Sequence, residues 1–193
     1  MAAERQIAAG GGQSAADAIA VGPAPGTAAP LATDVTQQVF RDAMARLAAT
    51  VHVITTDDEA GRAGATVTAV SSVTDEPPTL LVCLNRRSSV ARIVGANGVL
   101  AVNALRHGAH DLSSVFAGQG GINGHARFRH GSWSTLVTGA PLLDDSIASF
   151  DCRISGSADL GTHTIFHCRV VAVPARQEGS GLVYVGRRYT TTA

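Results

Sequence analysis

The sequence GATVTAVSSVT, residues 64–74, is the stretch that says most about the fold of this chain. Small and hydroxylated residues crowd this stretch among valines, a composition typical of a half-exposed strand followed by a turn. Its backbone N–H groups and hydroxyls could also hold a phosphate or the polar edge of a bound ring, because such donors bind anions without lysine. Taken alone, the stretch favours the simpler interpretation, a threonine-rich strand without a ligand.

Other strand-like runs lie on both sides of it. The complete set of predicted strands is 51–55, 66–73, 79–84, 100–105, 147–155, 164–173 and 182–185. The turn at 57–61 predicts a hairpin between the first two, and Pro77-Pro78 marks a further break. Helical spacing occurs only in short segments, at 36–47, 88–96 and 109–116. Many strands with few helices predict a mainly β fold, an antiparallel barrel or sandwich.

The first 34 residues differ in composition from the rest. Alanine and glycine dominate them, three prolines interrupt them, and few large apolar side chains are present. Such a segment buries too little surface to offset the entropy of ordering it. We therefore expect a disordered tail over residues 1–34 and one folded domain over residues 35–193.

Composition excludes several classes of function. The 15 basic residues balance the 15 acidic ones, so no basic excess indicates nucleic acid. All 15 are arginine, which excludes lysine Schiff bases and lysine-containing phosphate loops. The 3 cysteines show no Cys-x-x-Cys spacing, and no apolar run approaches the ~20 residues of a membrane helix. We expect a cytoplasmic protein without disulfides or membrane segments.

Two further segments are candidates for ligand binding. Residues 83–89, CLNRRSS, leave a predicted strand and enter a predicted helix, where helix N–H groups, hydroxyls and arginine would suit a phosphate. An ordinary Ser88 N-cap explains the same residues equally well. His163 lies between two long strands and could contact a ligand, although a lone histidine is more often structural.

No metal site is predicted. His107 and His110 have a suitable spacing, but no carboxylate or cysteine cluster completes a set of ligands. His163 and His167 would share one face of a strand, about 13 Å apart, which is too far for one ion.

Taken in order, these segments resemble the flavin-reductase-like family, the short-chain flavin reductases of two-component monooxygenases. The resemblance covers residues 38 to 190. It rests on residues 66–74, Pro77-Pro78, 83–85, Ser88, Val102-Asn103, 113–118, Arg127-Phe128, Trp133, 161–163, Ile165-Phe166 and 187–189. The branch serving bacterial pyrimidine utilisation is most similar, through residues 40–44, 54–57, 60–64, 72–75, 77–86 and 149–155. Thr162, where the wider family usually has Asp, also fits that branch, whereas Ala65, Ser71 and the loop 118–125 depart from it.

The resemblance implies a split β-barrel, a Greek-key antiparallel FMN-binding fold, that forms a homodimer with flavin near the subunit interface. It also implies an enzyme that uses NADH, or alternatively NADPH, to reduce FMN, or alternatively FAD. The reduced flavin would diffuse to a flavin-dependent monooxygenase, of pyrimidine degradation or an aromatic hydroxylase. A non-catalytic flavin-binding module remains an alternative, as does an oxidase or oxygenase acting on its own organic substrate.

The same resemblance implies a set of site residues. His163 would position the nicotinamide and is the expected catalytic residue. The expected flavin-binding residues are Thr66, Val67, Thr68, Ala69, Ser71, Ser72, Asn85, Ser88, Ser89, Asn103, Phe128 and Tyr189. Hydride transfer between nicotinamide and flavin needs orientation and dry packing more than an acid–base pair, so the lack of a catalytic triad agrees with this chemistry.

Overall fold

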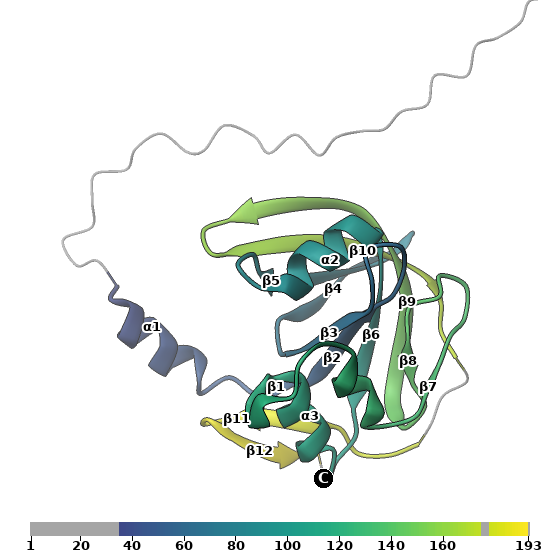
Figure 1. Ribbon diagram of the computed structural model, residues 1–193. Coiled ribbons are helices and arrows are strands. Elements are labelled where there is room, and N and C mark those ends of the chain that lie inside the picture. Colours follow the sequence, from purple (N-terminus) through teal and green to yellow (C-terminus); the bar gives the residue numbers. More distant parts are fainter. Residues whose placement is uncertain (1–34, 175–177, 193) are drawn as a thin grey trace, which may run out of the picture. The chain divides into compact units, whose positions relative to one another are not determined.

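The two edges of the main sheet are strands that follow one another in the chain. Its strands are β2 (His52–Thr56), β3 (Ala63–Val67), β4 (Val70–Asp75), β5 (Pro78–Asn85), β6 (Val99–Leu105), β9 (Ser146–Leu160) and β10 (His163–Ala172). They lie in the order β3-β2-β6-β9-β10-β5-β4, and every neighbouring pair is antiparallel. Only Thr68 and Ala69 separate the edge strands β3 and β4 in the chain, a gap that can span at most about 11 Å. The sheet therefore curls round until its edges approach (Figure 1).

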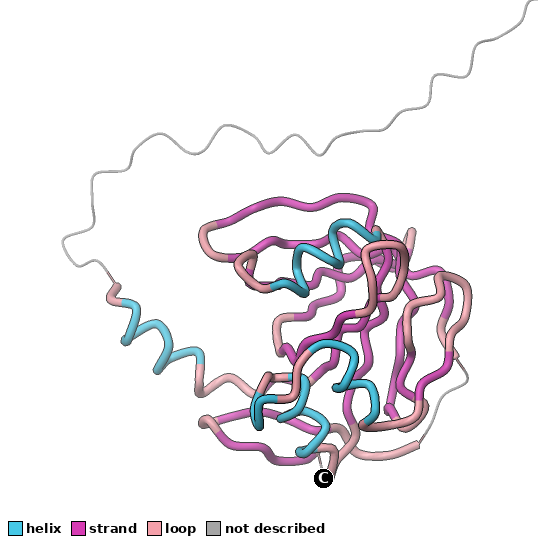
Figure 2. Tube along the Cα trace, viewed as in Figure 1, coloured by secondary structure: helices cyan, strands magenta, loops and turns pink. Residues whose placement is uncertain are grey.

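The computed structural model describes residues 35–174 and 178–192. The predicted tail, residues 1–34, lies outside them. Residues from Gln38 onward form one compact unit. Strands make up most of the regular structure, as Figure 2 shows in magenta, so the prediction of a mainly β antiparallel fold is confirmed. Within the described ranges, no helix is both long and apolar enough to cross a membrane.

The remaining elements are short. The small strands are β1 (Ala49–Thr50), β7 (Trp133–Ser134), β8 (Leu142–Leu143), β11 (Leu182–Val185) and β12 (Arg188–Thr191). They form a three-stranded sheet, β1-β11-β12, and the pair β7-β8. The helices are α1 (Gln37–Met44), α2 (Ser89–Asn97), α3 (His110–Phe116) and the 3₁₀ turns η1 (Gln119–Gly121) and η2 (Gly124–Arg129).

One predicted strand is wrong. The sequence predicted a single strand over residues 66–73, but β3 ends at Val67 and β4 begins at Val70. The break is a tight turn in which the Val70 N–H donates to the Thr68 carbonyl at 3.0 Å. The Cys83 N–H then donates to the Ala69 carbonyl at 3.0 Å, which holds the turn against β5. This turn contains neither glycine nor proline, so the residue types gave no sign of it.

The core has two large parts, one on each face of the sheet, and a small third cluster formed by Ala101, Ala140 and Leu142. One face of all seven strands forms the barrel interior, where Ile54, Val102 and Phe166 are buried and α2 adds Val94. The second cluster covers the other face of β2, where Val53 is buried with aromatic residues from α3 and η2. Consecutive residues Val53 and Ile54 are both 0% exposed, because β2 is covered on both faces.

The β11–β12 hairpin turns through Gly186 and Arg187. Both residues have positive φ, 57° and 59°, as a two-residue hairpin with the twist of its strands requires. The Arg187 guanidinium pairs with the Asp42 carboxylate on α1, and the Gly186 N–H donates to the Ala45 carbonyl at 2.6 Å. The hairpin tip therefore fastens α1 to the rest of the domain.

Candidate functional site

A cleft of about 500 Å³ lies at the β3–β4 junction. Its walls come from that junction, the end of β5 with the start of α2, the tip of the β9–β10 hairpin, and the β11–β12 hairpin. Eight predicted site residues meet there, namely Thr66, Val67, Thr68, Ala69, Asn85, Ser88, His163 and Tyr189. The fold thus gathers residues that are up to 123 positions apart in the chain, which no local motif could show.

Ser88 precedes the first residue of α2 as its N-cap, at one wall of the cleft. Its backbone is extended, with φ −76° and ψ 144°, and its Oγ accepts a hydrogen bond from the Ala91 N–H at 3.1 Å. The N-cap interpretation of Ser88 is therefore correct. The Ser88 hydroxyl still has a proton to donate, and the helix N-terminus carries partial positive charge. This end of the cleft consequently suits an anionic group such as a phosphate.

His163 begins β10, where it pairs in register with Asn85 of β5. Thr162 Oγ1 lies 2.9 Å from His163 Nδ1, and the Thr162 carbonyl accepts from the Arg86 N–H at 3.0 Å. Arg86 also pairs with Asp159 across the hairpin at 3.2 Å. These contacts hold the hairpin tip against β5 and orient the imidazole, whose Nε2 remains available to a ligand.

Tyr189 forms the opposite wall with Tyr184. The two residues pair across the β11–β12 hairpin, and their ring centroids are 5.3 Å apart at an edge-on angle. The His110 ring also packs against Tyr189, with ring centroids 5.3 Å apart. The Tyr189 hydroxyl lies 2.9 Å from Ser113 Oγ. Aromatic surface held in this way can pack against a planar ligand and exclude water from it.

Five predicted flavin residues do not line this cleft: Ser71, Ser72, Ser89, Asn103 and Phe128. Ser71 and Ser72 are exposed on the edge strand β4, and Ser89 is exposed in the first turn of α2. Phe128 is buried, with its ring centroid 5.2 Å from Phe116 and 5.1 Å from Trp133.

Asn103 is fully buried on β6, and its amide is engaged with protein groups. Nδ2 donates to the Val53 carbonyl at 3.0 Å and to Thr55 Oγ1 at 3.1 Å. Oδ1 accepts from the Leu143 N–H and from Ser149 Oγ, both at 2.8 Å. In this conformation the side chain fastens β8 and β9 to β2 and makes no contact with the cleft.

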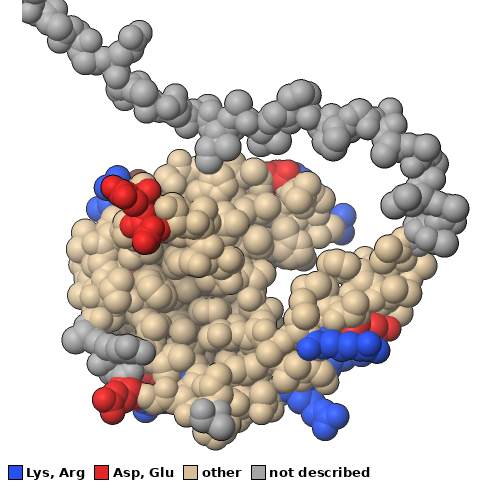
Figure 3. All heavy atoms as spheres, turned by 180° about the vertical axis from the view of Figure 1, so that it is seen from behind, with Lys and Arg blue, Asp and Glu red and all other residues tan. Residues whose placement is uncertain are grey.

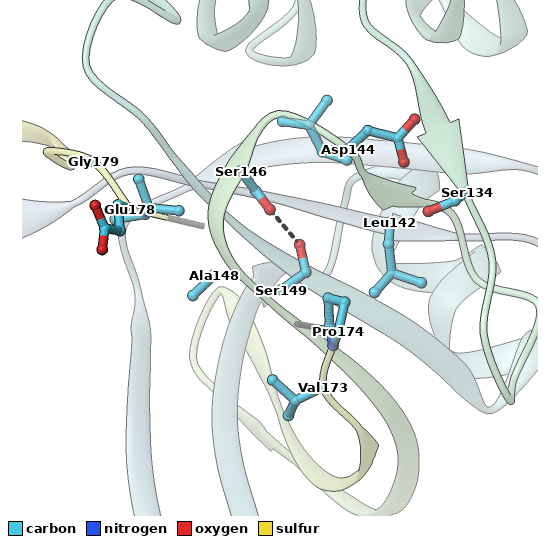
Figure 4. A pocket seen from close by; sticks show the side chains of 12 residues that line it. Ser134, Leu142, Asp144, Ser146, Ala148, Ser149, Val173, Pro174, Glu178 and Gly179 are labelled. Carbon is cyan, nitrogen blue, oxygen red and sulfur yellow. Dashed lines mark hydrogen bonds between the residues drawn. The ribbon is translucent and has the colours of Figure 1, made fainter. Parts of the chain in front are cut away.

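A larger hollow of about 880 Å³ lies elsewhere, between the start of β9 and the segments beside residues 174 and 178 (Figure 4). Ser146 and Ser149, which both line it, are joined by a hydrogen bond 2.8 Å long. None of the predicted site residues lines this hollow. We assign the site to the smaller cleft, because it combines an anion-binding helix start, polar backbone and an aromatic wall.

Sequence reasoning missed several cleft residues, among them Tyr184 and Val51, and it included Cys83 only as part of the candidate segment 83–89. Tyr184 could have been found, because a two-residue turn at 186–187 places it opposite Tyr189. Burial raises the pKa of the Cys83 thiol, so Cys83 contributes a neutral surface and no thiolate. Among the described residues, no group of three or more His, Cys, Asp or Glu side chains could hold a metal ion.

Comparison with known proteins identifies the family. The model of the flavin reductase like domain matches residues 44–193. The chain belongs to the flavin reductase like family. It is 55% identical over 163 residues to the FMN reductase (NADH) RutF of Stutzerimonas stutzeri strain A1501, covering 84% of this chain and 92% of the relative.

Two further relatives extend this comparison. The FMN reductase (NADH) RutF 2 of Rhizobium rhizogenes strain K84 is 53% identical over 156 residues, which cover 81% of this chain and 89% of the relative. Among solved structures, the flavin reductase PheA2 in its native state superposes with a TM-score of 0.74 at 27% identity, over 82% of this chain and 99% of the other. The family expected from the sequence is confirmed.

Proposed function

We propose that this flavin reductase uses NADH to reduce FMN in the cleft at the β3–β4 junction. The observation that carries the proposal is the meeting of an anion-binding helix start, His163 and an aromatic wall in one cleft. Its volume of about 500 Å³ lies within the ~300–1,000 Å³ typical of cofactor sites. Relatives more than half identical to this chain are named NADH-dependent FMN reductases.

The donor set of the cleft fits FMN. Ser88 and the N-terminus of α2 would hold the phosphate, and the backbone of Thr66 to Ala69 would hold the polar edge of the ring system. When bound, FMN supplies the acceptor for the hydride. His163 orients the nicotinamide through Nε2, and Tyr184 and Tyr189 exclude water from the reacting faces.

A homodimer is the assembly that we propose for this reductase. Three large apolar residues in and just beyond α1, Phe40, Met44 and Leu47, are 47–60% exposed. Figure 3 shows a broad uncharged area on one face of the molecule, with charged side chains at its margins. Interface cores are depleted of charge, which supports the proposal. Gel filtration with light scattering tests it, and a mass of one chain, 19.7 kDa, would contradict it.

The reduced flavin is proposed to leave and serve a partner monooxygenase in the cytoplasm. A single domain with a cleft of about 500 Å³ leaves little room for an organic substrate in addition to flavin and nicotinamide. The resemblance of the sequence to the pyrimidine-utilisation branch favours a partner that cleaves a pyrimidine.

The decisive experiment follows NADH consumption by its absorbance, with FMN, with FAD and without added flavin. The proposal expects turnover that rises and saturates with FMN. Flavin binding without turnover would contradict it and leave a non-catalytic flavin-binding module.

The role of His163 is tested in the same assay by His163→Ala. We expect kcat/KM to fall by roughly tenfold, the scale of one lost orienting contact. His167→Ala is the matched control, because His167 lies on the same strand β10 and outside the cleft. Equal kinetics for His163→Ala and wild type would remove His163 from the mechanism.

A further inference from the structure

Ser113 connects two walls of the cleft without lining it. It lies on α3 and is fully buried. Its carbonyl accepts a hydrogen bond from Thr66 Oγ1 at 2.7 Å, and its Oγ lies 2.9 Å from the Tyr189 hydroxyl. One residue therefore binds the polar wall through its backbone and the aromatic wall through its side chain.

The two walls belong to different sheets. Thr66 lies on β3, an edge of the seven-stranded sheet, whereas Tyr189 lies on β12, an edge of the three-stranded sheet. The Tyr189 ring also contacts Tyr184 and His110, both edge-on at 5.3 Å, but Tyr184 belongs to the same hairpin and does not connect Tyr189 to β3. The hydrogen bond to Ser113 is the contact that fixes the position of the Tyr189 hydroxyl relative to β3.

The separation of these walls matters for a flat ligand. Attraction between packed atoms is greatest at about 3.5–4.0 Å, and an added gap of about 0.5–1 Å loses a quarter to a half of it. A wall that drifts outward by that amount weakens every contact across the ring at once. A residue that fixes the wall can therefore control affinity without touching the ligand.

We propose that Ser113 is a positioning residue that sets the spacing between Thr66 and Tyr189 and thereby the affinity of the cleft for FMN. The proposal rests on the proposed function only in taking FMN as the ligand. Ser113 itself contacts no ligand and takes no part in hydride transfer.

A double-mutant cycle on the full chain tests this role, with Ser113→Ala, Tyr189→Phe and both together. The readout is the Kd for oxidised FMN, measured by the change in flavin fluorescence on binding. Each single variant should raise Kd about fivefold, the scale of one hydrogen bond. Because both changes remove the same bond, the double variant should also be about fivefold weaker, whereas independent effects would multiply to about 25-fold.

Ser146→Ala is the matched control, because Ser146 is also a buried serine whose hydroxyl is hydrogen-bonded, to Ser149 at 2.8 Å. It should lower the thermal midpoint and leave the Kd for FMN unchanged. Multiplying effects in the double variant, or an equal rise in Kd for Ser146→Ala, would overturn the positioning role.

The failure of this proposal is distinguishable from that of the proposed function. Wild-type protein that binds FMN without oxidising NADH would contradict the reductase activity. The coupling between Ser113 and Tyr189 could still be measured in that case, from the Kd values for FMN of the single and double variants. Wild-type protein that turns over NADH but shows no coupling would overturn the role of Ser113 alone. Failure of the wild type to bind FMN would overturn both.

Discussion

Replacement of Asn103 by leucine is expected to destabilise the fold and to leave FMN binding intact. Leucine has a similar volume, so the change removes hydrogen bonds with little cavity. Five hydrogen bonds are lost, one of them a long contact of 3.5 Å to the Pro141 carbonyl, and the buried N–H of Leu143 is left without its acceptor. One or two unsatisfied buried groups, at about 1–3 kcal/mol each, give a loss of about 3 kcal/mol. At about 2–4 °C per kcal/mol for a domain of this size, the thermal midpoint should fall by about 10 °C.

The assay is thermal unfolding followed by circular dichroism, with FMN titration at a temperature where both proteins are folded. Ser149→Ala is the control, because it removes one of the five bonds to Asn103 together with the bond to Ser146 and should cost about 1–2 kcal/mol, less than Asn103→Leu. A midpoint within about 2 °C of wild type, less than about 1 kcal/mol, would refute the reasoning. A large rise in the Kd for FMN at unchanged stability would instead return Asn103 to the flavin-binding residues that the sequence indicated.

Three further changes test other parts of the structure. Burial lowers the pKa of His52 to about 4 from the usual 6.5, so the unfolded chain takes up a proton that the folded chain refuses. Stability should therefore fall by up to about 3 kcal/mol as pH drops from 6.5 towards 4, and His52→Leu should flatten this slope in urea unfolding. Gly64→Ala would place a Cβ 2.7 Å from the buried Phe116 ring, and calorimetry should show a loss of about 1–3 kcal/mol. Ser88→Ala should lower the free energy of unfolding by about 1 kcal/mol through the lost N-cap and should weaken FMN binding, as urea unfolding and FMN titration would show. Ser89→Ala is the control, because Ser89 is exposed in the same turn and its replacement should change stability little.

Local patterns in the sequence predicted most of the elements. Helices α2 and α3 and strands β2, β5, β6, β10 and β11 lie within a residue or two of their expected positions. The pattern of apolar and β-branched residues located these strands, because one or both faces of each strand are buried. It failed at Thr68 and Ala69, because their turn is held by hydrogen bonds to distant backbone and involves no special residue type.

The site was predictable only in part. Residues 66–69 and Ser88 belong to contiguous motifs, and the structure places them around one cleft. Ser113 and Tyr184 enter through contacts between elements far apart in the chain, which periodicity cannot show. Asn103 was predicted to bind flavin, but its buried amide is hydrogen-bonded to neighbouring strands. The sequence cannot distinguish such an asparagine from one that binds a ligand.

The two-residue link between β3 and β4 limits how this site can change in evolution. Thr68 and Ala69 line the cleft and also join the two edges of the curled sheet, so an insertion there would part the edges and reshape the cleft in one event. Substitution is the route left open at this wall. The hairpin tip before His163 and the turns after Ala117 do not join the two edges of the sheet, so changes in their length leave the sheet closed. Specialisation for different flavins or donors is therefore expected to accumulate in those segments, while the length of the link is preserved.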